Sequence, residues 1–243
     1  MNIGIDIGSR FVKFAVDDSK KIKLYKDNSL DFYKNLDYYK DTFKNDRIVT
    51  TGYGRHKLQV LSGKVIPELQ AHALGAIKML NLENFCLLDI GGQDTKVLLV
   101  KKGKLIDFRT NDKCAASSGR FLENMARILD IDITEIMESF EEPIEISSTC
   151  AIFSESEIIA AITNGVPIKR IAAGINYALF LRIKPWLKEL KEKNIVLSGG
   201  IAKSPALMYF IKKEFKDTTI IVPEEPIYTG ALGCLYYMEE SDE

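Results

Sequence analysis

The sequence lacks the features that would direct the protein to a membrane or to a nucleic acid. Its formal net charge is only -1 over 243 residues, so bulk electrostatics favour neither nucleic acid nor an anionic membrane as a partner. No apolar run approaches the length of a membrane span, and the N-terminus begins in a strand-like pattern instead of a signal peptide. We therefore expect a cytoplasmic protein with no nucleic-acid partner and no membrane partner.

Cysteine is also scarce, with four residues in the chain: Cys86, Cys114, Cys150 and Cys234. In the cytoplasm these residues are expected to be reduced, which favours a metal or redox role over disulfide bonds. Cys86 and Cys234 lie in apolar, element-like contexts, and we interpret them as small buried hydrophobic residues. The other two cysteines are the candidates for chemistry.

Cys114 and Cys150 have similar surroundings. Each is flanked by small or hydroxyl residues and precedes a helical run of apolar residues. A thiol just before a helix meets unpaired backbone N–H groups and the positive end of the helix dipole, which favours the thiolate. An iron–sulfur cluster takes four such ligands, and one chain offers two. The sequence therefore predicts a symmetric homodimer that shares one cluster.

A strand ending in an aspartate–glycine turn occurs twice. Asp6, Gly8 and Lys13 match Asp89, Gly91 and Lys96 at one constant offset, which predicts an internal duplication. Amides of glycine and serine in such turns can face phosphate oxygens, and the aspartate is placed to hold Mg²⁺. Two similar domains can thus hold the phosphates of one nucleotide from both sides.

Three further segments suit a nucleotide site. Ser198-Gly199-Gly200 ends a predicted strand, and such a turn can pass beneath a purine ring because it has no side chains. Gly230 begins a closing helix of small residues, which we expect to pack against the helix that starts near Glu68. Glu68 either orients a hydrolytic water or simply favours the helix dipole. His72 is interpreted as a packed, hydrogen-bonded side chain, since no other histidine or cysteine lies at helical spacing.

These motifs resemble those of the ATP-hydrolysing activators (archerases) of 2-hydroxyacyl-CoA dehydratases and of the ATPase subunits of benzoyl-CoA reductase. The resemblance covers nearly the whole chain. The cysteine segments are specific to this family, whereas the aspartate–glycine turns are shared with the wider superfamily of acetate and sugar kinases, heat-shock ATPases and actin. The matching segments are Asp6-Ile7-Gly8-Ser9, Thr51-Gly52-Tyr53-Gly54-Arg55, Asp89-Ile90-Gly91-Gly92-Gln93-Asp94, Asn111-Asp112-Lys113-Cys114-Ala115-Ala116, Ser148-Thr149-Cys150-Ala151-Ile152-Phe153, Ser198-Gly199-Gly200 and Gly230-Ala231-Leu232-Gly233.

The resemblance implies an α/β fold of two duplicated actin-like (ribonuclease H-like) domains around a nucleotide cleft. Residues 1–82 would form the N-terminal domain, with a C-terminal helix of about residues 228–240 packing back on it. Residues 83–227 would form the second domain, which carries the cluster cysteines.

The resemblance also implies an activity, that of an ATPase coupled to electron transfer in an anaerobic metabolism. ATP or ADP with Mg²⁺ would bind in each subunit, and one 4Fe–4S cluster per homodimer would be bound by Cys114 and Cys150 of both chains. The reduced dimer would pass a low-potential electron to an iron–sulfur protein such as a 2-hydroxyacyl-CoA dehydratase. Reduced ferredoxin or flavodoxin would be the electron donor.

The candidate residues fall into three groups. The catalytic candidates are Asp6, Glu68, Asp89 and Gln93. The cofactor-binding candidates are Gly8, Ser9, Lys13, Gly91, Gly92, Gly199, Gly200 and Gly230, and the metal ligands are Cys114 and Cys150.

Two other classes of protein are consistent with the aspartate–glycine turns. A small-molecule kinase of the same superfamily would bind ATP and a substrate without a cluster. A non-enzymatic, actin-like regulatory dimer would bind ATP without an acceptor reaction. The kinase class gives no account of two cysteines that precede helices, and both classes predict a colourless, air-stable protein.

Overall fold

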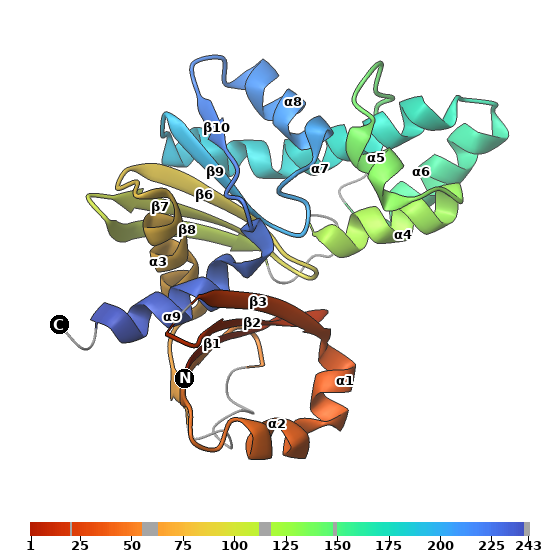
Figure 1. Cartoon of the computed structure of the whole chain (residues 1–243). Helices are drawn as coiled ribbons and strands as arrows, with labels where there is room; N and C mark the ends of the chain where they lie inside the picture. Colours follow the sequence, from red (N-terminus) through yellow and green to blue (C-terminus); the bar gives the residue numbers. More distant parts are fainter. Residues whose placement is uncertain (20, 55–62, 112–117, 148–149, 241–243) are drawn as a thin grey trace. The chain divides into compact units, whose positions relative to one another are not determined.

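A computed structural model of the chain describes residues 1–19, 21–54, 63–111, 118–147 and 150–240 (Figure 1). The chain divides into two compact units. The first unit comprises Met1–Asn84, Val100–Ile106 and Pro223–Glu243, and the second comprises Phe85–Leu99 and Asp107–Val222. Two five-stranded sheets are present among the described residues.

The sheet of the first unit has the strand order β3-β2-β1-β4-β5. β1, β2 and β3 are antiparallel, while β4 runs parallel to β1 and β5 parallel to β4. The register places Asp6 of β1 opposite Lys13 of β2 and Thr51 of β4. The strands are β1 (Asn2–Ile7), β2 (Phe11–Asp17), β3 (Ile22–Asn28), β4 (Arg47–Thr51) and β5 (Lys64–Val65).

Helices pack against both faces of this sheet, and β1 is therefore buried. Ile3, Ile5 and Ile7 pack in one apolar cluster with Phe32 of α1 (Ser29–Lys34) and Phe43, which follows α2 (Leu36–Thr42). A second cluster contains side chains of α3 (Glu68–Leu80) and of α9 (Thr229–Glu240). The backbone of α9 approaches β1 so closely that a Cβ on Gly4 would lie 2.1 Å from the carbonyl oxygen of Ala231. The C-terminal helix therefore completes the fold of the first unit.

The sheet of the second unit repeats this topology. Its order is β10-β9-β6-β7-β8, and β6, β9 and β10 run parallel. β6 thus corresponds to β1, β9 to β4 and β10 to β5, which matches the duplication predicted from the two aspartate–glycine turns. The strands are β6 (Phe85–Ile90), β7 (Thr95–Lys101), β8 (Lys104–Asn111), β9 (Asn194–Gly199) and β10 (Thr219–Ile221).

The helices of the second unit share one large apolar core. α7 buries Ile171, Ile175, Leu179 and Ile183 along one stripe, and it continues through Pro185, where the sequence predicts a kink or a break. Figure 1 shows α4, α5 and α6 grouped beside the N-terminal half of α7. These helices are α4 (Gly119–Leu129), α5 (Ile133–Glu138), α6 (Ala151–Thr163), α7 (Ile168–Leu190) and α8 (Pro205–Glu214).

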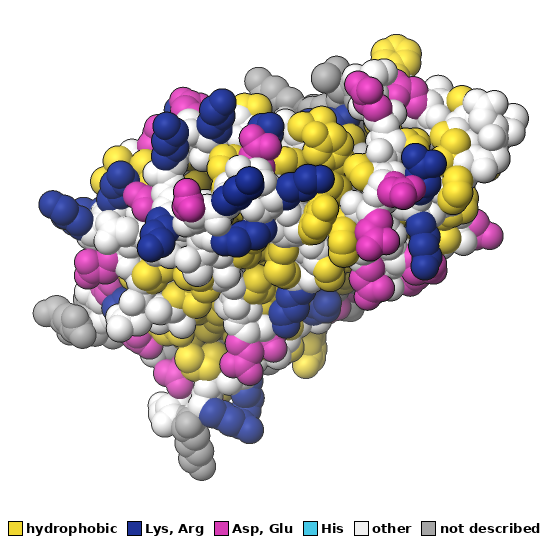
Figure 2. Space-filling view, turned by 90° about the horizontal axis from the view of Figure 1, so that it is seen from above, with side chains coloured by type: hydrophobic (Ala, Val, Ile, Leu, Met, Phe, Trp, Pro, Cys, Tyr) yellow, Lys and Arg dark blue, Asp and Glu magenta, His cyan; other side chains and the backbone are white. Residues whose placement is uncertain are grey.

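The surface carries charges of both signs. On the face seen in Figure 2, the Lys and Arg side chains are interspersed with Asp and Glu side chains. None of the described helices is both long enough and apolar enough to cross a membrane.

Candidate nucleotide and metal sites

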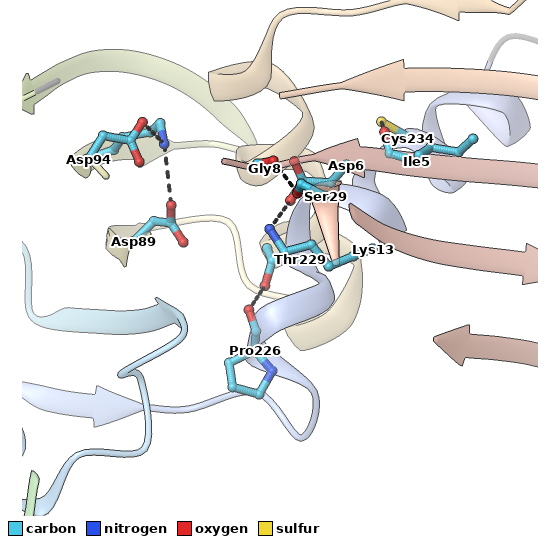
Figure 3. Close-up of polar contacts among 11 residues, drawn as sticks. Ile5, Asp6, Gly8, Lys13, Ser29, Asp89, Asp94, Pro226, Thr229 and Cys234 are labelled. Carbon is cyan, nitrogen blue, oxygen red and sulfur yellow. Dashed lines mark hydrogen bonds and ion pairs between the residues drawn. The ribbon is translucent and has the colours of Figure 1, made fainter. Parts of the chain in front are cut away.

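Asp6 lies near the end of β1 and is 1% exposed. Its Oδ2 atom accepts a hydrogen bond from the Lys13 ammonium at 3.0 Å, as Figure 3 shows. The strand register produces this contact, because Asp6 and Lys13 are paired residues of the β1–β2 hairpin. The first turn therefore combines a buried carboxylate with a partly exposed cation.

The turn after β1 is held by Ser29. The Ser29 hydroxyl donates to the Gly8 carbonyl at 2.8 Å (Figure 3). The Ser29 N–H donates to the Arg10 carbonyl at 3.0 Å. The Gly8 N–H donates to the Phe11 carbonyl at 3.1 Å. A Cβ on Gly8 would lie 2.9 Å from the Lys13 ammonium nitrogen, so glycine lets this cation approach the turn. Ser9 itself is exposed.

The second unit repeats this arrangement around Asp89, which is 3% exposed. The buried Lys96 ammonium lies 3.6 Å from Asp89 Oδ2 and 2.6 Å from Asp94 Oδ2. The Gly91 N–H donates to the Asp94 carbonyl at 2.9 Å, as the Gly8 N–H does to Phe11. Gln93, between these residues, is exposed.

The start of α4 is hydrogen-bonded to this second turn. The Gly119 N–H donates to the Gly91 carbonyl at 2.8 Å, and the Arg120 N–H donates to the Gly92 carbonyl at 3.0 Å. These two N–H groups belong to the first turn of the helix, where no intrahelical acceptor exists. The aspartate–glycine turn and the helix that follows the first cysteine segment are thus in direct contact.

Two glycines keep the end of the second sheet free of side chains. Gly199 has φ +86°, and a Cβ there would lie 2.3 Å from the Ile90 carbonyl and 3.0 Å from Asp89 Oδ1. The Gly200 N–H donates to the same carbonyl at 3.1 Å. This turn therefore packs against the strand end that carries Asp89.

Gly52, in the matching segment Thr51-Gly52-Tyr53-Gly54-Arg55, is the counterpart of Gly199 in the first unit, and its approach to Asp6 was not predicted from the sequence. It follows β4 with φ +94°, and a Cβ would lie 2.7 Å from Asp6 Oδ1. The Gly54 N–H donates to the Ile7 carbonyl at 3.2 Å, as that of Gly200 does to Ile90. The sequence could have indicated this correspondence, because a glycine lies at the end of a strand in both units.

Glu68 and His72 face Asp6 within the first unit. Their spacing of four places both on one side of α3, and ligand atoms of all three residues lie within 4.8 Å of one another. His72 is buried, as expected for a packed histidine, but its neighbours are two carboxylates. Gly230 of α9 closes the group, since a Cβ there would lie 2.8 Å from His72 Nε2 and 3.0 Å from Asp6 Oδ2.

Cys150 directly precedes α6, as the sequence predicts, and is its N-cap residue. It is partly exposed, and its carbonyl accepts hydrogen bonds from the Ser154 N–H at 3.0 Å and the Ser154 hydroxyl at 2.9 Å. The other predicted cluster ligand, Cys114, lies outside the described residues.

Cys86 and Cys234 are buried, which confirms their interpretation as small hydrophobic residues. Burial, and then the charge of Glu192, raises the pKa of the Cys86 thiol to about 12. Burial and the charge of Asp6 also raise the pKa of Cys234 well above its usual value. These two thiols are therefore unsuited to bind a metal as thiolates.

The repeated sheet and the paired aspartate turns define the class of protein, an α/β protein of two actin-like domains, as predicted. Within that class, the chain belongs to the BadF/BadG/BcrA/BcrD ATPase family, whose sequence model matches residues 3–237. The family predicted from the sequence motifs is thereby confirmed, together with ATPase as its general activity.

One sequence match and two solved structures illustrate the similarity. The 2-hydroxyisocaproyl-CoA dehydratase activator of Clostridioides difficile is 40% identical over 203 residues, which are 81% of this chain and 75% of the activator. The activator of the 2-hydroxyisocaproyl-CoA dehydratase from Clostridium difficile, solved with bound ADPNP, has a TM-score of 0.86 and 34% identity, covering 99% of this chain and 95% of that one. Component A of the (R)-2-hydroxyglutaryl-CoA dehydratase of Acidaminococcus fermentans has a TM-score of 0.85 and 31% identity, covering 100% and 99%.

Proposed function

We propose that the protein is an ATP-hydrolysing iron–sulfur activator, which passes a low-potential electron to a partner iron–sulfur enzyme of the 2-hydroxyacyl-CoA dehydratase type. The observation that carries this proposal is the pair of hydrogen bonds from Gly119 and Arg120 to the carbonyls of Gly91 and Gly92. These bonds join a candidate phosphate-binding turn to the helix after the Cys114 segment. They provide a physical route from the nucleotide to the metal site.

The nucleotide part of the proposal rests on the two aspartate turns. Asp6 and Asp89 are buried carboxylates at strand ends, suited to hold Mg²⁺ through water molecules. Lys13 is placed to move from Asp6 to a phosphate oxygen, which would keep its charge compensated. Glycine amides of both turns complete the phosphate contacts. Similarity to an activator solved with ADPNP supports nucleotide binding by this chain.

The remaining nucleotide candidates have separate roles in this proposal. Ser9 and Gln93 are exposed on the two turns, where they can contact phosphate or the attacking water. Glu68, partly exposed at the start of α3, is the second candidate for orienting that water. The turn of Gly199 and Gly200 offers a surface without side chains for the base.

The metal part of the proposal rests on Cys150 at the start of α6. Two copies of the chain, each supplying Cys114 and Cys150, offer the four thiolates of a 4Fe–4S cluster. Exposed apolar side chains lie immediately beside Cys150, with Ile152 72% exposed and Phe153 66% exposed. A second copy of the chain would cover them, because the partner's cysteines must reach the same cluster.

Electron transfer through the cluster requires a donor and an acceptor. Reduced ferredoxin or flavodoxin would supply one electron to the cluster, and water would cleave ATP to ADP and phosphate. The cluster would then pass the same electron to the partner iron–sulfur protein. ATP hydrolysis contributes the free energy as a coupling between two sites, the turns and the cluster. Relatives named as dehydratase activators support this class of acceptor.

The test separates the two halves of the proposal by mutation. Asp6→Ala and Asp89→Ala should leave a brown protein with its iron, while ATP hydrolysis falls about a hundredfold or more. Cys150→Ala should lose the iron but retain binding of ATP and Mg²⁺. Cys86→Ala is the matched control, and it should retain both iron and hydrolysis because its thiol is buried elsewhere. Unchanged iron in Cys150→Ala, or unchanged hydrolysis in Asp89→Ala, would contradict the assignment.

A further inference from the structure

We propose that Asp6, Glu68 and His72 form a binding site for a divalent first-row transition-metal ion, and that the ion binds directly to these side chains without nucleotide. The proposal goes beyond the proposed function, in which Mg²⁺ enters together with ATP. It shares Asp6 with that function but does not depend on ATP hydrolysis.

The geometry of the three side chains suits one ion. Their ligand atoms all lie within 4.8 Å of one another. Metal bonds to oxygen and imidazole nitrogen of about 2.1 Å place opposite ligands about 4.2 Å apart. An ion can therefore contact all three residues after small side-chain adjustments. Two of the ligands come from one face of α3 and the third from the end of β1, so rigid elements hold the set.

The space for an ion is left by glycine. The Cβ position on Gly230 lies 2.8 Å from His72 Nε2 and 3.0 Å from Asp6 Oδ2, so any side chain there would block both ligand atoms. On the other oxygen of the same carboxylate, a Cβ on Gly52 would lie 2.7 Å from Oδ1. Two separate segments thus lack a side chain where it would cover Asp6. Only glycine can therefore approach Asp6 at these two positions.

The local charge also favours a cation. Asp6 is 1% exposed, and Glu68 adds a second carboxylate beside it. The Lys13 ammonium at 3.0 Å balances one of these charges. Two carboxylates close together, one buried and one partly exposed, repel each other, and a nearby cation lowers this cost. A divalent ion compensates both, and it would displace Lys13 from Asp6 Oδ2.

Histidine determines which ions are favoured. Mg²⁺ prefers oxygen ligands, whereas an imidazole nitrogen suits the first-row transition ions. We therefore expect Mn²⁺ to bind in preference to Mg²⁺. Mn²⁺ is also the best probe, because it competes poorly for the thiolates that bind zinc or iron.

The experiment titrates nucleotide-free protein with Mn²⁺ and measures the free ion by electron paramagnetic resonance. Wild type should bind about one Mn²⁺ per chain, and about a tenfold excess of Mg²⁺ should not displace it. His72→Gln and Glu68→Gln should each weaken binding about tenfold or more. Gly230→Ala should weaken it as well, because its Cβ occupies the space for the ion.

Asp89→Asn is the matched control, since this aspartate lies in the second unit. It should lose ATP hydrolysis if the proposed function holds, yet bind Mn²⁺ like wild type. Binding by wild type that Mg²⁺ displaces as easily as Mn²⁺, or His72→Gln and Glu68→Gln variants that both bind like wild type, would overturn the metal site. Failure of ATP hydrolysis in every form, with Mn²⁺ binding intact, would contradict the proposed function alone.

Discussion

At the residue scale, each aspartate of the two turns has a lysine seven positions later. Lys13 contacts Asp6, while Lys96 lies beside both Asp89 and Asp94. The two lysines differ in exposure, since the Lys13 side chain is 21% exposed and that of Lys96 is 6% exposed. We therefore propose that Lys13 exchanges its carboxylate for a phosphate, whereas Lys96 lies between two carboxylates of the turn after β6.

The residue-scale site was only partly predictable from the sequence. The aspartates, the turn glycines and Cys150 were found because each has a local motif. The approach of Gly52 to Asp6 and the carboxylate neighbours of His72 were not predicted, because Asp6 lies on a strand that is distant in sequence from both. Contacts of that kind depend on how β1 and α3 pack, which a local spacing does not contain.

The thiols should react with alkylating reagents according to their burial. In protein freed of its cluster, iodoacetamide at pH 8 should label Cys150 and leave Cys86 and Cys234 unlabelled until urea unfolds the chain. The rate at Cys86 in native protein should stay low from pH 8 to 10, because its pKa is raised to about 12. Mass spectrometry of tryptic peptides measures this. Equal labelling of Cys86 and Cys150 in native protein would contradict it.

The same pKa shift predicts a pH dependence of stability. A thiol whose folded-state pKa is raised stabilises the fold fully below its unfolded value of about 8.5, and this contribution is lost as the pH rises toward the folded value. The unfolding midpoint in urea should therefore fall from about pH 9 upward. The decline should be smaller in Cys86→Ala, and an identical decline in both proteins would remove this explanation.

At the scale of the elements, α4 is the connection between the turn after β6 and the first cysteine segment. Its first two N–H groups donate to the turn, so we expect a movement of Gly91 or Gly92 to displace the helix start. The sequence predicted that a helix follows each cysteine. The sequence did not predict this contact, because both hydrogen bonds join backbone groups and so do not depend on which side chains are present.

The pair Gly119→Ala and Gly119→Pro tests this connection. Both variants place a Cβ about 3.1 Å from the Gly91 carbonyl, but only proline removes the N–H that donates to it. Proline is tolerated at the first position of a helix, and the extended Ser118 before it is compatible with proline. The fold should therefore persist in both, but proline should cost more in urea unfolding than the about 1 kcal/mol of one hydrogen bond, because its Cδ replaces the amide hydrogen and must push the Gly91 carbonyl away.

The functional readout of this pair is the dependence of electron transfer on ATP. Gly119→Ala should keep it, whereas Gly119→Pro should hydrolyse ATP but transfer electrons at least about tenfold more slowly. Electron transfer is measured by the oxidation of the reduced cluster in the presence of an acceptor. Equal transfer rates in the two variants would mean that the coupling does not pass through this hydrogen bond.

At the scale of the whole molecule, the duplicated topology was the most predictable feature. Two aspartate–glycine turns at one offset predicted two similar domains, and the two sheets have the same strand order. The division of the chain is less simple, because Val100–Ile106 and Pro223–Glu243 belong to the first unit. The sequence resemblance indicated a returning C-terminal helix, but composition alone does not distinguish such a return from a continuous second domain.

The dimer is predicted to depend on the apolar side chains at the start of α6. Phe153→Glu should shift the protein toward monomers by about tenfold or more in the dissociation constant, because a buried contact would then hold an unpaired charge. Leu30→Glu in α1 is the control, since Leu30 has a similar exposure of 62% but lies in the first unit. Analytical ultracentrifugation measures both. A Phe153→Glu variant as dimeric as wild type would exclude this interface.

In the function proposed for this protein, two chains complete one iron–sulfur site. The most direct test is the iron and acid-labile sulfide content of the anaerobically purified protein, measured on the fraction whose native mass is known. The expected protein is a brown dimer with about four iron and about four sulfide per two chains. A colourless protein that stays free of iron and sulfide after anaerobic reconstitution would contradict it.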